Sequence, residues 1–134
     1  MRLWHKSLIP VLPKQQLLGQ WRECCLIAKS ITEKGTPNHL LVNKVLDYPM
    51  VHFYFYAELV ADEMRYRGYK CDFEKFIKWA GKFYITISYD ELFAYWHDVR
   101  YLKQCYYNLE EKYDCGGITE KEWQKIEQAV GYRI

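Results

Sequence analysis

The chain has 134 residues, of which 50% are hydrophobic and 18% aromatic, and its 19 basic and 17 acidic residues give a formal net charge of +2. Its length predicts one domain spanning residues 1–134 around a single core, and we expect a monomer. No apolar run is long enough to span a bilayer and no signal-peptide pattern opens the chain, so we expect a soluble, cytoplasmic protein without a membrane partner.

The first long helix is predicted to begin near Pro13, because proline suits a first helical turn. Hydrophobic residues then recur at helical spacing and form one apolar face, made by Leu17, Leu18, Trp21, Cys24, Cys25, Ala28 and Ile31. The opposite face carries Gln15, Gly19, Arg22 and Glu23. Two prolines separate residues 1–12 from this helix, so they are predicted to form an extended arm that folds back over its polar face.

Three further helices are predicted in the middle of the chain. A short one follows Thr36-Pro37-Asn38 and ends at Val45, and a long one runs from about Met50 to Arg67, where Gly68 closes it. A third is capped by Asp72 and continues to Ala80. Residues 83–87 alternate like a strand, but a single strand has no partner.

The last two helices are predicted from capping boxes at residues 88–91 and 119–122. The first of them would bury a stripe against the helix of residues 50–67. The stripe comprises Leu92, Tyr95, Trp96, Val99, Leu102, Tyr106, Leu109 and Tyr113. The predicted fold class is therefore all-α, a compact single-domain helical bundle with an extended N-terminal arm.

The N-terminal region brings together groups suited to amine chemistry. A primary amine is nucleophilic only when neutral, and an α-amine titrates at about 7.7 to 8.0 whereas a lysine titrates near 10.4. If the arm folds back, the α-amine of Met1 lies beside Glu23, with Arg2 and Arg22 nearby. A carboxylate raises the pKa of a neighbouring amine and arginines lower it, so the two effects partly cancel.

The residues from Arg2 to Glu23 carry a family resemblance. A near-terminal arginine, the pair Gln15-Gln16 and the triplet Trp21-Arg22-Glu23 on the first long helix resemble the pyrimidine-dimer DNA glycosylases of the phage endonuclease V type. Weaker similarity continues through residues 52–56 to 65–69. The resemblance implies a DNA repair enzyme that acts on damaged double-stranded DNA, at pyrimidine dimers or abasic sites. It also implies a DNA glycosylase with associated AP lyase activity that works through a Schiff base.

The resemblance also implies roles for individual residues. The amine of Met1 would attack the sugar C1′, because Arg2 is too bulky to allow removal of the methionine, and Glu23 would stabilise the cationic sugar and assist strand cleavage. Arg2 and Arg22 would hold phosphates or tune the amine. Gln15 would contact flanking bases or phosphates beside Gln16, which stands where the family pattern has a histidine. At position 26, where the pattern carries another arginine, this chain has a leucine.

A second reading comes from a different class of function. An Arg-Glu pair on a helix is usually a solvated face, and a net charge of +2 gives little general attraction to DNA. The chain could therefore be a non-catalytic helical module that binds nucleic acid or protein and has a decayed glycosylase site. Borohydride trapping separates the two readings, with Lys6 or Lys14 as the alternative amine.

Most of the other chemistry-bearing residues are predicted to be structural. The five cysteines and four histidines show no metal-ligand spacing, so we expect reduced cysteines, no metal and no cofactor. Trp and Tyr can stack on unpaired bases. Helical spacing nevertheless assigns Phe53, Trp96 and Tyr106 to the core, and Trp21 to the apolar face of its helix.

Overall fold

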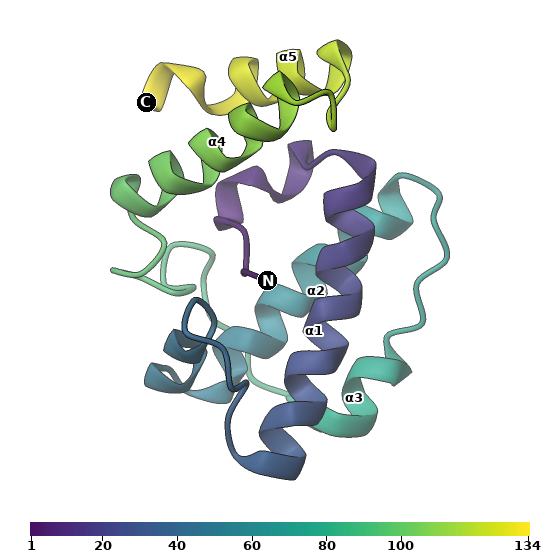
Figure 1. Ribbon diagram of the computed structural model, residues 1–134. Helices are drawn as coiled ribbons and strands as arrows, with labels where there is room; N and C mark the ends of the chain where they lie inside the picture. Colours follow the sequence, from purple (N-terminus) through teal and green to yellow (C-terminus); the bar gives the residue numbers. More distant parts are fainter.

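Helix α1 (Lys14–Lys34) runs through the middle of the computed structural model, which describes residues 1–134 (Figure 1). The helix starts directly after Pro13, as predicted, because proline lacks the N–H that a first turn would leave unpaired. Gly35 ends it in the left-handed conformation, with φ of 76°, and its N–H bonds to the carbonyl of Ile31. Trp21 is buried on the apolar face and stacks on Phe73 with ring centroids 5.9 Å apart.

Two helices pack against α1 and complete the lower layer in Figure 1. They are α2 (Met50–Tyr66) and α3 (Glu74–Ala80), and both lie within two residues of their predicted bounds. The short 3₁₀ helix η2 (Asn43–Asp47) precedes α2 and packs on it. Phe53 of α2 and Phe76 of α3 meet edge to face at 5.3 Å, so aromatic side chains fill the space between these helices.

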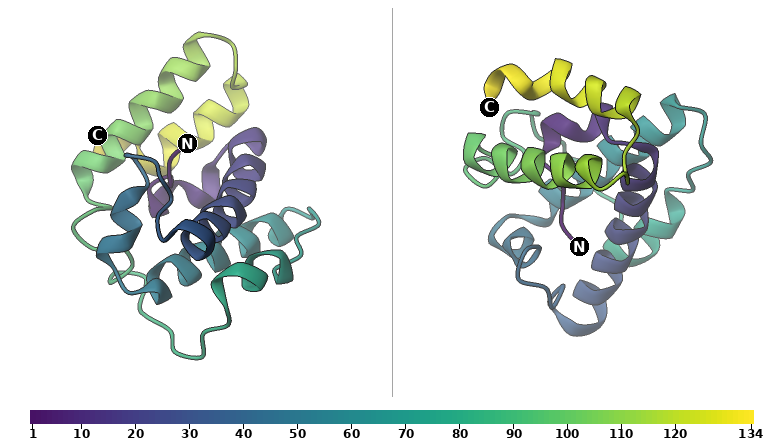
Figure 2. Two further views of the ribbon diagram at one scale, coloured as in Figure 1. Left: turned by 60° about the horizontal axis from the view of Figure 1, so that its bottom comes forward. Right: turned by 45° about the horizontal axis from the view of Figure 1, so that its top comes forward.

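Helices α4 (Val99–Asp114) and α5 (Glu120–Val130) form a hairpin over the N-terminal segment, and the short η3 (Gly131–Arg133) follows (Figure 2). The capping box of Thr119 and Glu122 is present in full, which confirms the predicted start of α5. Tyr106 and Tyr113 of α4 pack on Trp123 of α5. The structure contains no strand, residues 83–87 are irregular, and the all-α fold class is confirmed.

The predicted helix start at Ser88 is wrong, because α4 begins eleven residues later, after the N-cap Asp98. The Glu91 N–H donates to Ser88 Oγ as in a capping box, and the Ser88 hydroxyl donates to Glu91 Oε1, but these bonds close only a turn. Phe93 and Tyr95 have φ values of 49° and 73°, which no right-handed helix allows. The intervening residues form turns.

The hydrophobic stripe of residues 92–113 is predicted to pack against α2, and this prediction is also wrong for most of the stripe. Tyr95 is 96% exposed and Val99 is 47% exposed. Within α4 itself, the buried Tyr106 packs on Trp123 of α5, and the buried Cys105 contacts Arg2 of the N-terminal segment. Phe93 and His97, which precede α4, contact Tyr56 of α2.

The N-terminal segment differs from the predicted arm. Residues 1–5 are extended, but Lys6–Val11 form the 3₁₀ helix η1, which packs on α2 and α5. Leu3 and Leu8 are completely buried, so the segment is part of the core and does not lie over a finished helix surface. An extended stretch with so many apolar residues gains more from burial than from lying on a polar helix face.

Two further features follow from the completed fold. All five cysteines are free, and two of them, Cys24 and Cys105, are buried. None of the helices combines the length and hydrophobicity that crossing a bilayer requires.

Candidate active site

Residues 2–4 are held by hydrogen bonds to three different helices. Gln20 of α1 accepts from the Trp4 N–H at 2.7 Å and donates to the Arg2 carbonyl at 3.0 Å. From α2, the Tyr56 hydroxyl donates to the Trp4 carbonyl at 2.6 Å. From α4, the Tyr101 hydroxyl donates to the Leu3 carbonyl at 2.6 Å. The path of the chain up to Met1 is therefore fixed from several sides.

A pair of buried histidines anchors the next residues. The His5 and His97 rings stack at 5.1 Å, the Lys6 N–H donates to His97 Nδ1 at 3.0 Å, and His5 Nε2 lies 2.8 Å from the His97 carbonyl. Burial lowers the pKa of His5 to about 4 and holds the pKa of His97 well below its usual range. Both imidazoles are therefore neutral near pH 7, and each can accept one backbone N–H bond.

Lys6 completes this anchor with its side chain. Its ammonium donates to the carbonyls of Tyr89 and Leu92 at 2.7 and 2.8 Å, and burial lowers its pKa. These bonds tie the turns before α4 to the N-terminal segment. The backbone oxygens satisfy the charge of the Lys6 ammonium.

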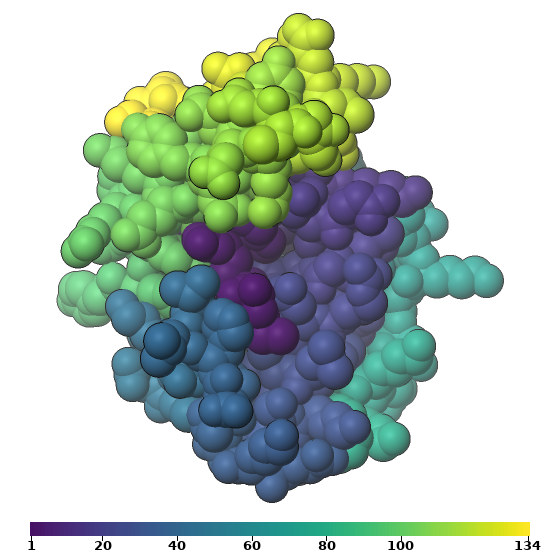
Figure 3. Space-filling model, viewed as in Figure 1, coloured from purple at the N-terminus to yellow at the C-terminus, as the bar shows by residue number.

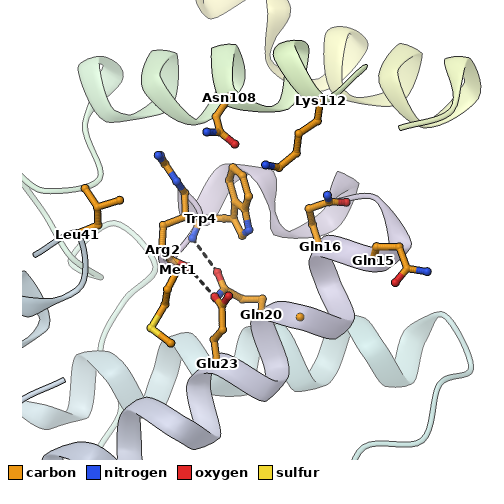
Figure 4. A pocket seen from close by; sticks show the side chains of 11 residues that line it. Met1, Arg2, Trp4, Gln15, Gln16, Gln20, Glu23, Leu41, Asn108 and Lys112 are labelled. Carbon is orange, nitrogen blue, oxygen red and sulfur yellow. Dashed lines mark hydrogen bonds between the residues drawn. The ribbon is translucent and has the colours of Figure 1, made fainter. Parts of the chain in front are cut away.

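A pocket of about 370 Å³ opens where the N-terminus reaches the surface (Figure 3). It lies between the N-terminal residues, the polar face of α1, the turn before η2 and one face of α4. Eleven residues line it: Met1, Arg2, Trp4, Gln15, Gln16, Gly19, Gln20, Glu23, Leu41, Asn108 and Lys112. Figure 4 shows Met1 and Glu23 at one end, with Asn108 and Lys112 pointing in from α4 at the other.

Glu23 is the one carboxylate of this pocket and is half-buried. Burial raises its pKa, against the opposing attraction of the Met1 amine and other positive groups. Its Oε2 accepts from Gln20 Nε2 at 3.2 Å, so the same glutamine orients both the carboxylate and the chain that carries the amine. No direct ion pair joins Glu23 to the amine, although both face the pocket.

Three cationic groups share the pocket with that carboxylate: the Met1 amine, Arg2 and Lys112. The Arg2 guanidinium lies 5.3 Å from the centre of the Trp4 ring and contacts Cys105 Sγ at 3.6 Å. Trp4 itself is 6% exposed, and that small exposed part belongs to the pocket. The balance of charge and the aromatic wall suit an anionic ligand with planar groups.

Five of the six residues singled out from the sequence line this pocket: Met1, Arg2, Gln15, Gln16 and Glu23. Gln16 Oε1 is buried without a hydrogen-bond partner, so it retains an acceptor for a ligand. Arg22 does not line the pocket and is exposed on the outer side of α1. The Arg22 guanidinium lies near Gly19: a Cβ added at Gly19 would be 3.9 Å from Arg22 Nη2.

Sequence reasoning missed four polar or aromatic contributors, namely Trp4, Gln20, Asn108 and Lys112. Gln20 had a visible signal, because it stands one turn from Leu17 and Cys24 on the apolar side of α1 and is 1% exposed. A polar residue at such a position needs buried partners. Asn108 and Lys112 had no comparable signal, since they reach the pocket only through the packing of α4.

The structure offers no group of three or more His, Cys, Asp or Glu side chains that could hold a metal ion. The pocket itself presents an amine, a carboxyl group and further cations. These act as nucleophile, proton carrier and electrostatic support respectively in covalent catalysis by amines.

Comparison with known proteins gives one match. The family described as pyrimidine dimer DNA glycosylase matches residues 1–76, which is more than half of the chain and includes nine of the eleven residues that line the pocket. No curated protein and no solved structure matches the chain. The matched part ends within α3 and excludes α4. The chain belongs to the pyrimidine dimer DNA glycosylase family.

Proposed function

We propose that the α-amine of Met1 is the nucleophile of a DNA glycosylase with associated AP lyase activity. The neutral amine attacks the sugar C1′, the C1′–N bond to the base breaks, and the base leaves with a proton. Loss of the nitrogen proton and opening of the sugar ring give an imine between C1′ and the amine. Removal of a C2′ proton then expels the 3′ phosphate and cleaves the strand, and water releases the amine.

The observation that carries this proposal is the presence of the Met1 amine and Glu23 in one pocket. The pocket also contains Arg2 and Lys112, which match phosphate oxygens. Four hydrogen-bonded contacts to residues 2–4 limit the motion of the amine. Such fixation favours attack, because a positioned nucleophile avoids much of the entropic part of the barrier.

The environment of Glu23 supports its role as the acid and base of the reaction. Burial raises its pKa toward neutrality, so its protonated form persists to a higher pH than in an exposed glutamate. A group with a pKa nearer the working pH both donates and accepts protons efficiently. In its ionised form Glu23 stabilises the positive charge that develops on the sugar, and in its protonated form it assists departure of a leaving group.

The remaining pocket residues bind the DNA in this proposal. Arg2 contacts a phosphate next to the lesion, and Gln15 and Gln16 contact the flanking bases or phosphates, with the unpaired Gln16 Oε1 as an acceptor. Arg22, outside the pocket, contacts a more distant phosphate. The family supports a pyrimidine dimer as the damaged base, and the lyase step extends the substrate class to abasic sites.

Borohydride trapping on an abasic duplex tests the amine directly. We expect a covalent adduct with the authentic N-terminus, confirmed by intact mass, and none when one Gly-Ser pair precedes Met1, because the extension displaces the amine. Affinity for the duplex should change much less. Peptide mapping of the reduced adduct should locate the cross-link on Met1.

The matched control is Lys112→Arg, because Lys112 supplies the other primary amine of the pocket. This variant keeps the positive charge but cannot form an imine. We expect it to be trapped like the wild type. An adduct that survives N-terminal extension and disappears in Lys112→Arg would contradict the role of Met1. Reversible DNA binding without any adduct would favour the non-catalytic module.

A further inference from the structure

Two fully exposed hydrophobic side chains stand beside the candidate active site. Leu40 is 90% exposed and Tyr95 is 96% exposed, and both line a second depression of about 300 Å³. Leu41, 51% exposed, lines this depression and the active-site pocket alike, so the two are adjacent. Exposed apolar side chains grouped at the edge of a site are a feature of binding surfaces.

The turn that presents Leu40 is closed by local hydrogen bonds. The Val42 and Asn43 N–H groups donate to the His39 carbonyl at 2.9 and 2.8 Å. The Asn43 Oδ1 accepts from the His39 N–H at 3.1 Å, and His39 Nδ1 accepts from the Leu41 N–H at 3.3 Å. Leu40 is therefore displayed at the tip of an ordered turn and does not extend from a loose loop.

Tyr95 is displayed by a backbone conformation that tyrosine rarely adopts, with φ of 73°. The surrounding turns are fixed to α2 and the segment before it. His52 Nδ1 accepts from the Phe93 N–H at 3.1 Å, and the Tyr48 hydroxyl donates to the Ala94 carbonyl. An unfavourable conformation of this kind persists only where neighbouring contacts enforce it, and such residues cluster at functional sites.

Charges around the depression fit a nucleic acid strand. Lys44 and Arg100 line it together with the apolar side chains. The one carboxylate, Asp98, is occupied as the N-cap of α4, where Oδ1 accepts from the Tyr101 N–H at 2.8 Å. Aromatic and apolar faces between cations allow a base to stack while the adjoining phosphates are neutralised.

We propose that Tyr95 and Leu40 receive an unstacked base of the DNA strand next to the lesion, with Tyr95 stacking on the base and Leu40 wedging against its neighbour. Lys44 and Arg100 contact the phosphates on either side. This inference rests on the proposed function, since it places the lesion in the adjacent pocket. Extracting a damaged nucleotide leaves a gap in the base stack, and apolar wedges compensate for such gaps.

The test uses a duplex with a tetrahydrofuran abasic analogue, which the amine cannot attack, so that binding is measured without chemistry. Tyr95→Gly removes the ring, and we expect it to weaken binding between about five-fold and a hundred-fold, as loss of one base–aromatic stack does. Glycine relieves the positive φ, so the melting temperature should not fall. Tyr95→Phe should restore wild-type affinity, and Leu40→Ala should weaken binding in the same direction as Tyr95→Gly.

Tyr84→Ala is the matched control, because Tyr84 is 90% exposed but lines neither depression. We expect its affinity to equal that of the wild type. A 5-iodouracil next to the analogue should cross-link to Tyr95 on irradiation, whereas one placed seven bases away should not. Wild-type affinity in both Tyr95→Gly and Leu40→Ala would overturn the inference. It would also be overturned if the wild type were a dimer that Tyr95→Gly converts to a monomer, because the surface would then bind a second copy of the chain.

Borohydride trapping of the wild type on a true abasic duplex is measured in parallel. Trapping combined with unchanged affinity of the Tyr95 and Leu40 variants refutes the stacking surface and leaves the proposed function intact. Absence of trapping combined with weakened binding of these variants refutes the amine chemistry and supports the surface as a DNA contact.

Discussion

Residues 1–76 and residues 77–134 contribute different things to the same pocket. The first part, which matches the glycosylase family, supplies the Met1 amine, Arg2, the glutamines and Glu23. The second part supplies few groups that line the pocket, Asn108 and Lys112, but it supplies much of what holds the N-terminus. Tyr101 bonds to the Leu3 carbonyl and His97 bonds to the Lys6 N–H.

The groups of the pocket come mainly from the first part, but both parts fix the N-terminal segment that carries the amine. An α-amine on a free chain end has no defined place, and here its place depends on residues about a hundred positions away, as with Arg2 and Cys105. The family match covers the first part alone, whereas the position of the amine also depends on residues outside the match. Substitutions in the two parts should consequently affect different measurable steps.

The largest effect is expected from Glu23→Gln, in the part that carries the reactive groups. The change removes the proposed acid and base without altering side-chain size, so turnover on a pyrimidine-dimer duplex should fall about 100- to 10,000-fold. Affinity and circular dichroism should stay close to those of the wild type. A nicking assay on ultraviolet-irradiated DNA measures the loss, and full activity would remove Glu23 from the mechanism.

Gln20→Leu should give the largest loss of stability, because Gln20 holds the N-terminal segment to α1 within the first part. The Trp4 N–H loses a buried acceptor and the Arg2 carbonyl loses its donor, so we expect the free energy of unfolding to fall by at least about 2 kcal/mol. Urea denaturation measures this difference. Gln16→Leu is the control, since Gln16 Oε1 has no partner and its removal should cost little. Equal destabilisation by both variants would contradict the role of Gln20 as the anchor of the N-terminal segment.

His97→Phe tests the second part, because it keeps a ring in the core but removes the acceptor for the Lys6 N–H. We expect about 2 kcal/mol of destabilisation and trapping about ten-fold slower, since a shifted amine attacks less efficiently. Affinity for the unreactive abasic analogue should be unchanged, because His97 does not line the pocket. Single-turnover trapping at saturating DNA measures the effect. An unchanged trapping rate would show that the anchor does not position the amine.

The smallest effect is expected from Arg22→Ala, at an exposed position outside the pocket. Loss of one phosphate contact should reduce the slope of log affinity against log salt concentration by about 0.9 without changing single-turnover trapping. Arg2→Ala should reduce the slope equally and also slow trapping. Arg65→Ala serves as the control, because Arg65 already pairs with Asp62 at 3.3 Å. Identical slopes for wild type and Arg22→Ala would assign Arg22 to the solvated surface.

Several features of the protein could be predicted from the sequence because they depend on neighbouring residues. The start of α1 at Pro13, its apolar face around Trp21, the extent of α2 and the capping box of α5 all rest on contacts within one or two turns. The same holds for the family resemblance, which lies in one short block before α1 and on its first turns. Local patterns also indicated an all-α fold, since no strand had a partner.

Only the tertiary structure decided where the N-terminal segment lies and where α4 begins. Residues 88–91 have the spacing of a capping box, yet the backbone of Phe93 and Tyr95 turns away from a helix. Lys6 bonds to the carbonyls of Tyr89 and Leu92 across more than eighty positions. Tertiary packing likewise decided that Lys112 lines the pocket and that Arg22 does not. Sequence patterns report interactions between near neighbours, whereas these positions are set by burial and hydrogen bonds between segments that meet only when the core is complete.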